Sequence, residues 1–160
     1  MKKYLYSILA ATLSVMMLPA CSDDDTNEVE TVVTYESLPQ IAQKFLTDYF
    51  GGKQNVSKIE QETDNDVIVY DVDLKDGFEI VFNSEGYWQE IDAPMNSSVP
   101  MEVIPEQIAQ TLNQQYPDYG VSEINTAGQN YHVELSNNQG GVSIELMLNQ
   151  SGEIISTSMN

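Results

Sequence analysis

Hydrophobic residues recur at helical spacing in two segments of this chain, residues 41–49 and 108–116. In both segments they fall at positions i, i+4 and i+8, which places them on one stripe of a helix. A proline precedes each segment, where it suits the first turn of a helix. Gly51-Gly52 follows the first segment and Pro117 follows the second, and both residue types end helices. The pattern therefore predicts two short amphipathic helices.

A strand pattern follows each predicted helix, and the first such pattern indicates a hairpin. If Asn65-Asp66 forms a two-residue turn, then Ile59 lies opposite Val72 and Lys58 lies opposite Asp73. This register places apolar side chains on one face of the hairpin and charged side chains on the other.

The second half of the chain allows the same geometry. Ile124 lies opposite Val133 if the turn is centred on Gly128-Gln129. The remaining predicted strands are, in chain order, residues 78–82, 87–91, 142–148 and 153–156. Each predicted helix is thus followed by four strands.

The two halves also resemble each other in sequence. Gln40–Gln43 recurs as Gln107–Gln110, and further matches follow at offsets between 67 and 61. The sequence therefore predicts two tandem helix-plus-four-strand units, residues 37–94 and 99–160. A unit of about 60 residues buries too little surface to be stable alone, so we expect one globular domain over residues 37–160. The predicted fold class is α+β, an antiparallel sheet with two helices packed on one face and the other face free for binding.

The first 20 residues have the pattern of a secretory signal peptide. Lys2 and Lys3 precede an uncharged apolar run, and the run ends in Leu-Pro-Ala before Cys21. The run is about 15 residues long, which is short for a membrane-spanning helix of about 20. A signal anchor with an incidental cysteine is the alternative.

Cys21 and its surroundings resemble the lipobox of bacterial lipoproteins, which implies a lipid anchor on the Cys21 thiol. Cys21 is the only cysteine, so it forms no intramolecular disulfide. Residues 21–36 are predicted to be an acidic, disordered tether, because like-charged polar segments bury too little surface to fold. Acidic residues directly after the lipidated cysteine also resemble a surface-export signal. We therefore expect an exported outer-membrane lipoprotein, periplasmic or surface-exposed.

The charge balance excludes one class of partner. Without residues 1–20 the chain has four lysines, no arginine and 25 acidic residues, a net charge of −21. A phosphate-binding surface requires clusters of lysine and arginine, so the sequence excludes binding to nucleic acid. The anionic surface favours cationic partners or divalent cations instead.

Several short motifs resemble the PepSY-like, beta-lactamase-inhibitor-like family. They are Leu38-Pro39, Tyr70–Leu74, Gly77, Glu79–Phe82 and Gly86–Trp88. The resemblance implies a cell-envelope location and a role as an inhibitor or binding module. The second half departs from the pattern, because Ile154 stands where the first half has Trp88.

No constellation for catalysis is evident, so the sequence predicts a protein that is not an enzyme. His132 is the only histidine, and it aligns with Asp71 on the outward face of a strand. There is no Gly-x-Ser-x-Gly nucleophile motif. No acidic residue lies in an apolar sequence context that would raise its pKa.

Acidic residues gather in the first predicted hairpin and form a candidate calcium site. Oxygen ligands suit calcium, and opposed carboxylates such as Glu60 and Asp71 destabilise a strand pair unless a cation lies between them. The candidate ligands are Glu60, Glu62, Asp64, Asp66, Asp71 and Asp73. The alternative is a solvated acidic face without metal, which Lys58 partly neutralises. The sequence implies no other cofactor.

Tyr87 and Trp88 are candidate partner-binding residues, because strand alternation directs one of them outward. The alternative is that Trp88 closes the core near the helix. Together these features predict a non-enzymatic envelope lipoprotein that binds a protein or peptide, with inhibition of an enzyme as one form of this binding. A calcium-binding module is the second hypothesis, and a carbohydrate-binding surface protein is the third.

Overall fold

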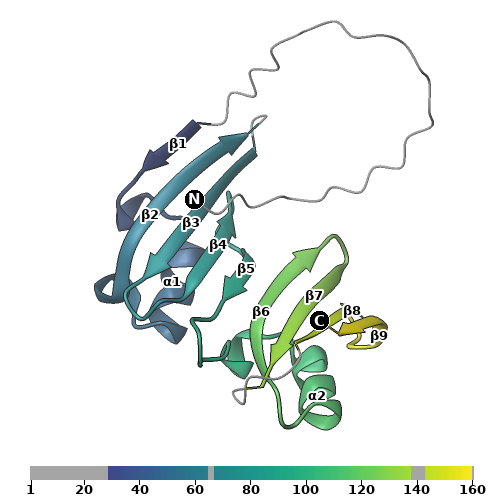
Figure 1. The fold of residues 1–160 in the computed structure, drawn as a ribbon. Coiled ribbons are helices and arrows are strands. Elements are labelled where there is room, and N and C mark those ends of the chain that lie inside the picture. Colours follow the sequence, from purple (N-terminus) through teal and green to yellow (C-terminus); the bar gives the residue numbers. More distant parts are fainter. Residues whose placement is uncertain (1–28, 65–66, 138–142, 160) are drawn as a thin grey trace, which may run out of the picture.

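The computed structural model describes residues 29–64, 67–137 and 143–159 of the chain (Figure 1). The α-helices are α1 (Gln40–Tyr49) and α2 (Glu106–Gln115), and the 3-10 helices are η1 (Tyr35–Ser37), η2 (Gly52–Asn55) and η3 (Met101–Val103). The strands are β1 (Val29–Val32), β2 (Val56–Asp64), β3 (Val67–Leu74), β4 (Glu79–Asn83), β5 (Trp88–Asp92), β6 (Gly120–Ala127), β7 (Asn130–Ser136), β8 (Ile144–Asn149) and β9 (Ile154–Met159). Neither α-helix in these ranges has the length and apolar character needed to cross a membrane.

The strands form one antiparallel sheet in which the spatial order equals the chain order, β1 to β9 (Figure 1). Apolar residues of seven strands lie directly opposite one another and form a row across this sheet, each at most 3% exposed. This core row consists of Ile59, Val72, Ile80, Ile91, Ile124, Val133 and Leu146. Strand alternation directs all seven side chains to one face of the sheet, where they form the centre of the core.

Both α-helices pack against this core, and each passes close to a glycine turn. Gly86 lies between β4 and β5 with φ 92°, and a Cβ there would be 2.8 Å from the backbone nitrogen of Ala42 in α1. Gly152 lies between β8 and β9 with φ 78°, and a Cβ there would be 2.4 Å from the carbonyl oxygen of Gln107 in α2. The missing side chains therefore allow both turns to contact the helix backbone.

The predicted α+β fold of two tandem helix-plus-four-strand units was wrong. The protein is mostly β, with two short α-helices and a single sheet of nine strands. The sheet is continuous because residues 90–92 of β5 pair with residues 123–125 of β6. In addition, β1 forms within residues 21–36, where the sequence predicted a disordered tether. The β-branched residues Val29 and Val32 suit a strand, and they pair with β2.

The local predictions within the hairpins were correct. Ile59 lies opposite Val72 and Ile124 lies opposite Val133, as expected from the turn positions. Both predicted helices are present as α1 and α2. Alternation and turn chemistry therefore determine each hairpin, whereas the pairing between β5 and β6 lay beyond these local signals.

Candidate binding face

The face of the sheet opposite the core row carries charged and polar side chains, and we refer to it as the polar face. One position away from the core row along each strand, six carboxylates lie directly opposite one another on the adjacent strands β3 to β8. This carboxylate row consists of Asp73, Glu79, Asp92, Glu123, Glu134 and Glu145. Adjacent strands are about 4.8 Å apart, so the row brings like charges together and destabilises the sheet.

Three carboxylates near the middle of the sheet lie close enough to share one cation. One oxygen each of Glu90, Asp92 and Glu123 lies within 4.8 Å of the other two, and all three residues are half-buried. The β5–β6 pairing produces this group, because Asp92 lies directly opposite Glu123. Asn125 also lies on this face, and its side-chain nitrogen donates to Glu123 Oε1 at 2.8 Å.

Burial and repulsion on the polar face favour the protonated form of two carboxyl groups. The pKa of Asp71 is raised to about 7, chiefly by burial and also by the charges of Asp73 and Glu62. Burial likewise raises the pKa of Glu90 to about 7, together with the charges of Asp92 and Glu123. Asp71 Oδ1 is buried and has no hydrogen-bond partner among the described residues. A positive charge at this face would therefore stabilise groups that the fold leaves in an unfavourable environment.

Most lysines among the described residues contact groups outside the polar face. Lys44 pairs with Asp48, and Lys53 pairs with Glu36. Lys75 Nζ donates to the Gln54 carbonyl oxygen at 2.6 Å. Strands β4 to β9 all follow Lys75 in the sequence. This part of the chain contains no lysine or arginine.

Among the residues that the structure describes, Lys58 is the one lysine that the register places on the polar face, and it lies on β2. It lies opposite Asp73 and forms an ion pair with Glu60. The hydrogen bond from Lys58 to Glu60 within this ion pair raises the pKa of Lys58. The charge of Lys58 is therefore used at one side of the sheet, away from the β5–β6 pair.

The structure places four of the six predicted calcium ligands on the polar face. Glu60 lies directly opposite Asp71, and Glu62 lies two positions further along β2. Asp73 belongs to the carboxylate row. Of the other two, Asp64 ends β2 opposite Val67, and Asp66 lies outside the described residues.

The other candidate residues lie in different environments. Tyr87 precedes β5 and is 54% exposed. Trp88 is half-buried against the core and its ring lies 6.2 Å from that of Tyr131. His132 lies on the polar face opposite Asn125, and Cys21 lies outside the described residues.

Sequence reasoning missed Glu90, Asp92 and Glu123. The signal was present in Glu90-Ile91-Asp92, where an apolar residue between two acids predicts two carboxylates on one strand face. Glu123 joins them only because β5 and β6 are neighbours, and these strands are separated by a segment without regular strand pattern.

Comparison with known proteins gives a consistent result. Residues 68–156 match the family described as beta-lactamase-inhibitor-like, PepSY-like. A periplasmic protein from Bacteroides vulgatus has a similar structure, with a TM-score of 0.70 and 31% identity, covering 81% of this chain and 99% of that one. A second protein from the same species has a TM-score of 0.71 and 28% identity, covering 86% and 99%. No curated protein matches the chain.

A third similar structure is a protein from Bacteroides thetaiotaomicron that is described as a calcium-regulated periplasmic protein. It has a TM-score of 0.71 and 28% identity, covering 81% of this chain and 96% of that one. All three proteins are described as periplasmic, which supports export of this chain.

Proposed function

Because the chain belongs to the beta-lactamase-inhibitor-like, PepSY-like family, we propose that it is a non-enzymatic binding protein of the cell envelope. The polar face of the sheet is its binding surface, and the partner is a protein or peptide with a basic surface. Inhibition of a secreted enzyme is the form of this function that the family description suggests.

The carboxylate row is the observation that carries this proposal. Six acids on six adjacent strands give a continuous anionic surface, with Lys58 opposite Asp73 at one end and no lysine or arginine in the chain after Lys75. Complementary charge across an interface accelerates association and selects the partner. A basic partner surface would also offset the repulsion within the row.

Binding to a basic peptide tests whether the polar face itself is responsible. We expect the variant Glu90→Gln, Asp92→Asn, Glu123→Gln to bind decalysine at least about tenfold more weakly than the unsubstituted protein, a loss of about 1.4 kcal/mol. Isothermal titration calorimetry at low salt provides the measurement, because surface electrostatics weaken as ionic strength rises.

A second variant with the same change in net charge is the control. Glu85→Gln, Glu102→Gln, Asp118→Asn alters exposed acids outside the carboxylate row and should bind decalysine like the unsubstituted protein. Equal weakening in both variants would show that decalysine responds only to net charge, and the polar face would then have no special role.

Calcium binding at Glu90, Asp92 and Glu123 is a second candidate function. Their oxygens lie within 4.8 Å of one another, and carboxylate oxygens are the ligands that calcium prefers. The calcium-regulated protein from Bacteroides thetaiotaomicron supports this candidate. We expect the site to bind weakly, because calcium requires six to eight oxygens in total and water would supply those that the protein does not.

Thermal unfolding with and without calcium tests this second candidate. A ligand that binds the folded state alone raises its stability, by about 2.7 kcal/mol at a concentration one hundred times Kd. We expect millimolar calcium to raise Tm by several degrees relative to EDTA, and magnesium to have a smaller effect. Loss of the shift in Glu90→Gln, Asp92→Asn, Glu123→Gln assigns the site, whereas an unchanged shift there contradicts it.

We further propose that the protein is anchored to the outer membrane through lipid on Cys21. Two or more acyl chains anchor a protein stably, whereas one chain gives only reversible binding. Replacing Cys21 by alanine is therefore expected to move the protein from the membrane fraction to the soluble envelope fraction. Retention of Cys21→Ala in membranes would contradict the lipid anchor, and protease treatment of intact cells distinguishes a surface location from a periplasmic one.

A further inference from the structure

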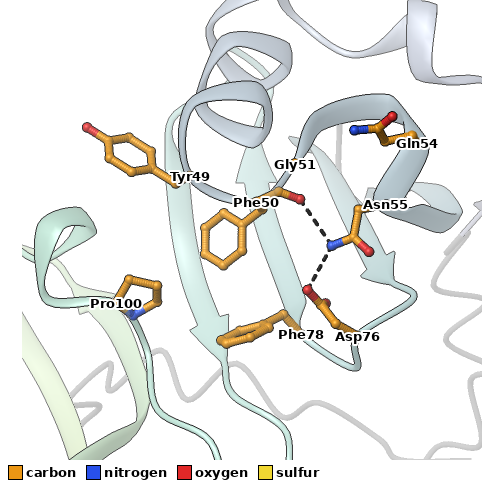
Figure 2. Close-up of a pocket in the computed structure, with 8 residues that line it drawn as sticks. All are labelled: Tyr49, Phe50, Gly51, Gln54, Asn55, Asp76, Phe78 and Pro100. Atoms are coloured by element: carbon orange, nitrogen blue, oxygen red, sulfur yellow. Dashed lines mark hydrogen bonds between the residues drawn. The ribbon is translucent and has the colours of Figure 1, made fainter.

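A pocket of about 450 Å³ lies at the C-terminal end of α1, beside the connection between β3 and β4 (Figure 2). Its walls come from three places in the sequence: Tyr49 ends α1 and Phe50 follows it, Phe78 follows the turn after β3, and Pro100 precedes η3. Ligand pockets typically have volumes of roughly 300–1,000 Å³, so this pocket can hold a small ring-shaped molecule.

Aromatic side chains form most of the apolar surface. The rings of Phe50 and Phe78 are 5.3 Å apart and inclined at 64°, and Phe50 is only 6% exposed, so this pair is held firmly by the core. Figure 2 shows Pro100 on one side of the pair and Tyr49 above it. Tyr49 is 46% exposed, so its ring is available to a ligand.

A fixed pair of polar side chains lies on the side of the pocket opposite Pro100 (Figure 2). The Asn55 side-chain nitrogen donates to the Phe50 carbonyl oxygen at 3.0 Å and to Asp76 Oδ2 at 2.8 Å. These bonds orient the exposed Asp76 carboxylate before any ligand arrives. A carboxylate has about four acceptor positions, so one bond from Asn55 leaves it able to accept hydrogen bonds from hydroxyl groups.

The charges around the pocket favour an uncharged ligand. The net charge of −21 for the chain after residue 20 repels anions. Lys75 Nζ lies near the same rim, where it donates to the Gln54 carbonyl oxygen, and its charge offsets that of Asp76. A cation would therefore gain little here, and an aromatic side chain would not use the acceptor positions that Asn55 leaves open on the Asp76 carboxylate.

We propose that this pocket binds one ring of a neutral carbohydrate. The C–H face of a pyranose ring packs on Tyr49 and the aromatic pair, and its hydroxyl groups donate to Asp76. This function is separate from the polar face, because the two sites share no residue.

Nuclear magnetic resonance titration of the purified protein tests the proposal. The probes are glucose, galactose, mannose and N-acetylglucosamine at tens of millimolar, with N-acetylphenylalaninamide as the aromatic alternative. We expect at least one sugar to shift the backbone amide signals of Gly51, Gln54 and Asn55. Tyr49→Ala should weaken this binding by at least about tenfold, whereas Tyr87→Ala, which alters a similarly exposed tyrosine outside the pocket, should not.

The remaining variants separate the possible outcomes. Asp76→Ala should also weaken the sugar, and an unchanged Tm would show that Tyr49→Ala and Asp76→Ala remain folded. The variant Glu90→Gln, Asp92→Asn, Glu123→Gln should bind the sugar normally, whatever happens to its binding of decalysine. Absence of any sugar-induced shift, equal loss in Tyr87→Ala, or shifts with N-acetylphenylalaninamide alone would each overturn the proposal.

Discussion

Unfolding of this protein is expected to require more urea at about pH 5 than at about pH 8, the reverse of ordinary acid denaturation. Asp71 and Glu90 cause the reversal, because their pKa values rise to about 7 in the folded protein from 3.8 and 4.5. Between about pH 4 and pH 7 the unfolded chain binds fewer protons than the folded protein. The free energy of unfolding therefore falls as pH rises through this window and is level above it.

The size of this fall follows from the pKa shifts. One pKa unit corresponds to about 1.4 kcal/mol, but both side chains are partly exposed, so solvent screening reduces the effect. We expect roughly 2 kcal/mol from Asp71 after this reduction, with a similar contribution from Glu90. Urea unfolding followed by circular dichroism at a series of pH values provides the measurement.

Asp71→Asn isolates one of the two groups. The amide resembles the protonated carboxyl in size but cannot ionise, so the variant should gain roughly 2 kcal/mol over the unsubstituted protein at about pH 8. The gain should vanish below about pH 3, where Asp71 is protonated in both the folded and the unfolded state. Asp118→Asn, at an exposed site, serves as the control. An equal gain at both pH values would contradict the ionisation argument.

Gly152→Ala is expected to destabilise the protein by about 3 kcal/mol or more, from overpacking together with left-handed backbone strain. The new Cβ would lie 2.4 Å from the Gln107 carbonyl oxygen, so α2 or the β8–β9 turn must move. A hydrogen bond also holds the β8–β9 turn against α2, because the Gly152 carbonyl oxygen accepts from Thr111 Oγ1 at 2.8 Å.

Gly128→Ala provides a matched control for backbone strain. Gly128 has φ 66°, yet a Cβ there would have no atom within 4 Å. This variant should lose only about 1–2 kcal/mol, the cost of the left-handed conformation. The difference between the two variants in urea unfolding at one pH measures the packing of the turn on α2. Equal losses would show that the turn does not press on the helix.

The sequence was sufficient for the hairpins and for the family. The register of Ile59 and Val72 followed from a two-residue turn and from alternation, both of which are local. The resemblance to the PepSY-like, beta-lactamase-inhibitor-like family was confirmed. Short-range signals therefore predicted which segments pair with their immediate neighbour across a tight turn.

The pairing of β5 with β6 at the centre of the sheet was not predicted, because it depends on a long connection. Between β5 and α2, Ala93 N donates to the Ser122 carbonyl oxygen and Val99 N donates to the Val121 carbonyl oxygen, both at 2.8 Å. These bonds hold the connection against β6, but residues 93–100 have no hydrophobic periodicity from which the bonds could be predicted. The predicted acidic site was consequently placed on β2 and β3 alone, and its extension to Asp92 and Glu123 was not foreseen.

The identical order of strands in the chain and in the sheet has a consequence for how this protein reaches its native state. Six of the eight strand pairs join consecutive strands through short connections, whereas β1–β2 and β5–β6 pair across longer ones. Folds with such short contact separations fold faster than sheets with distant pairings. A sheet of this kind can also gain or lose a strand at either edge without any change in the order of the other strands. Strand β1 is such an addition, beyond the eight strands that the sequence pattern predicts.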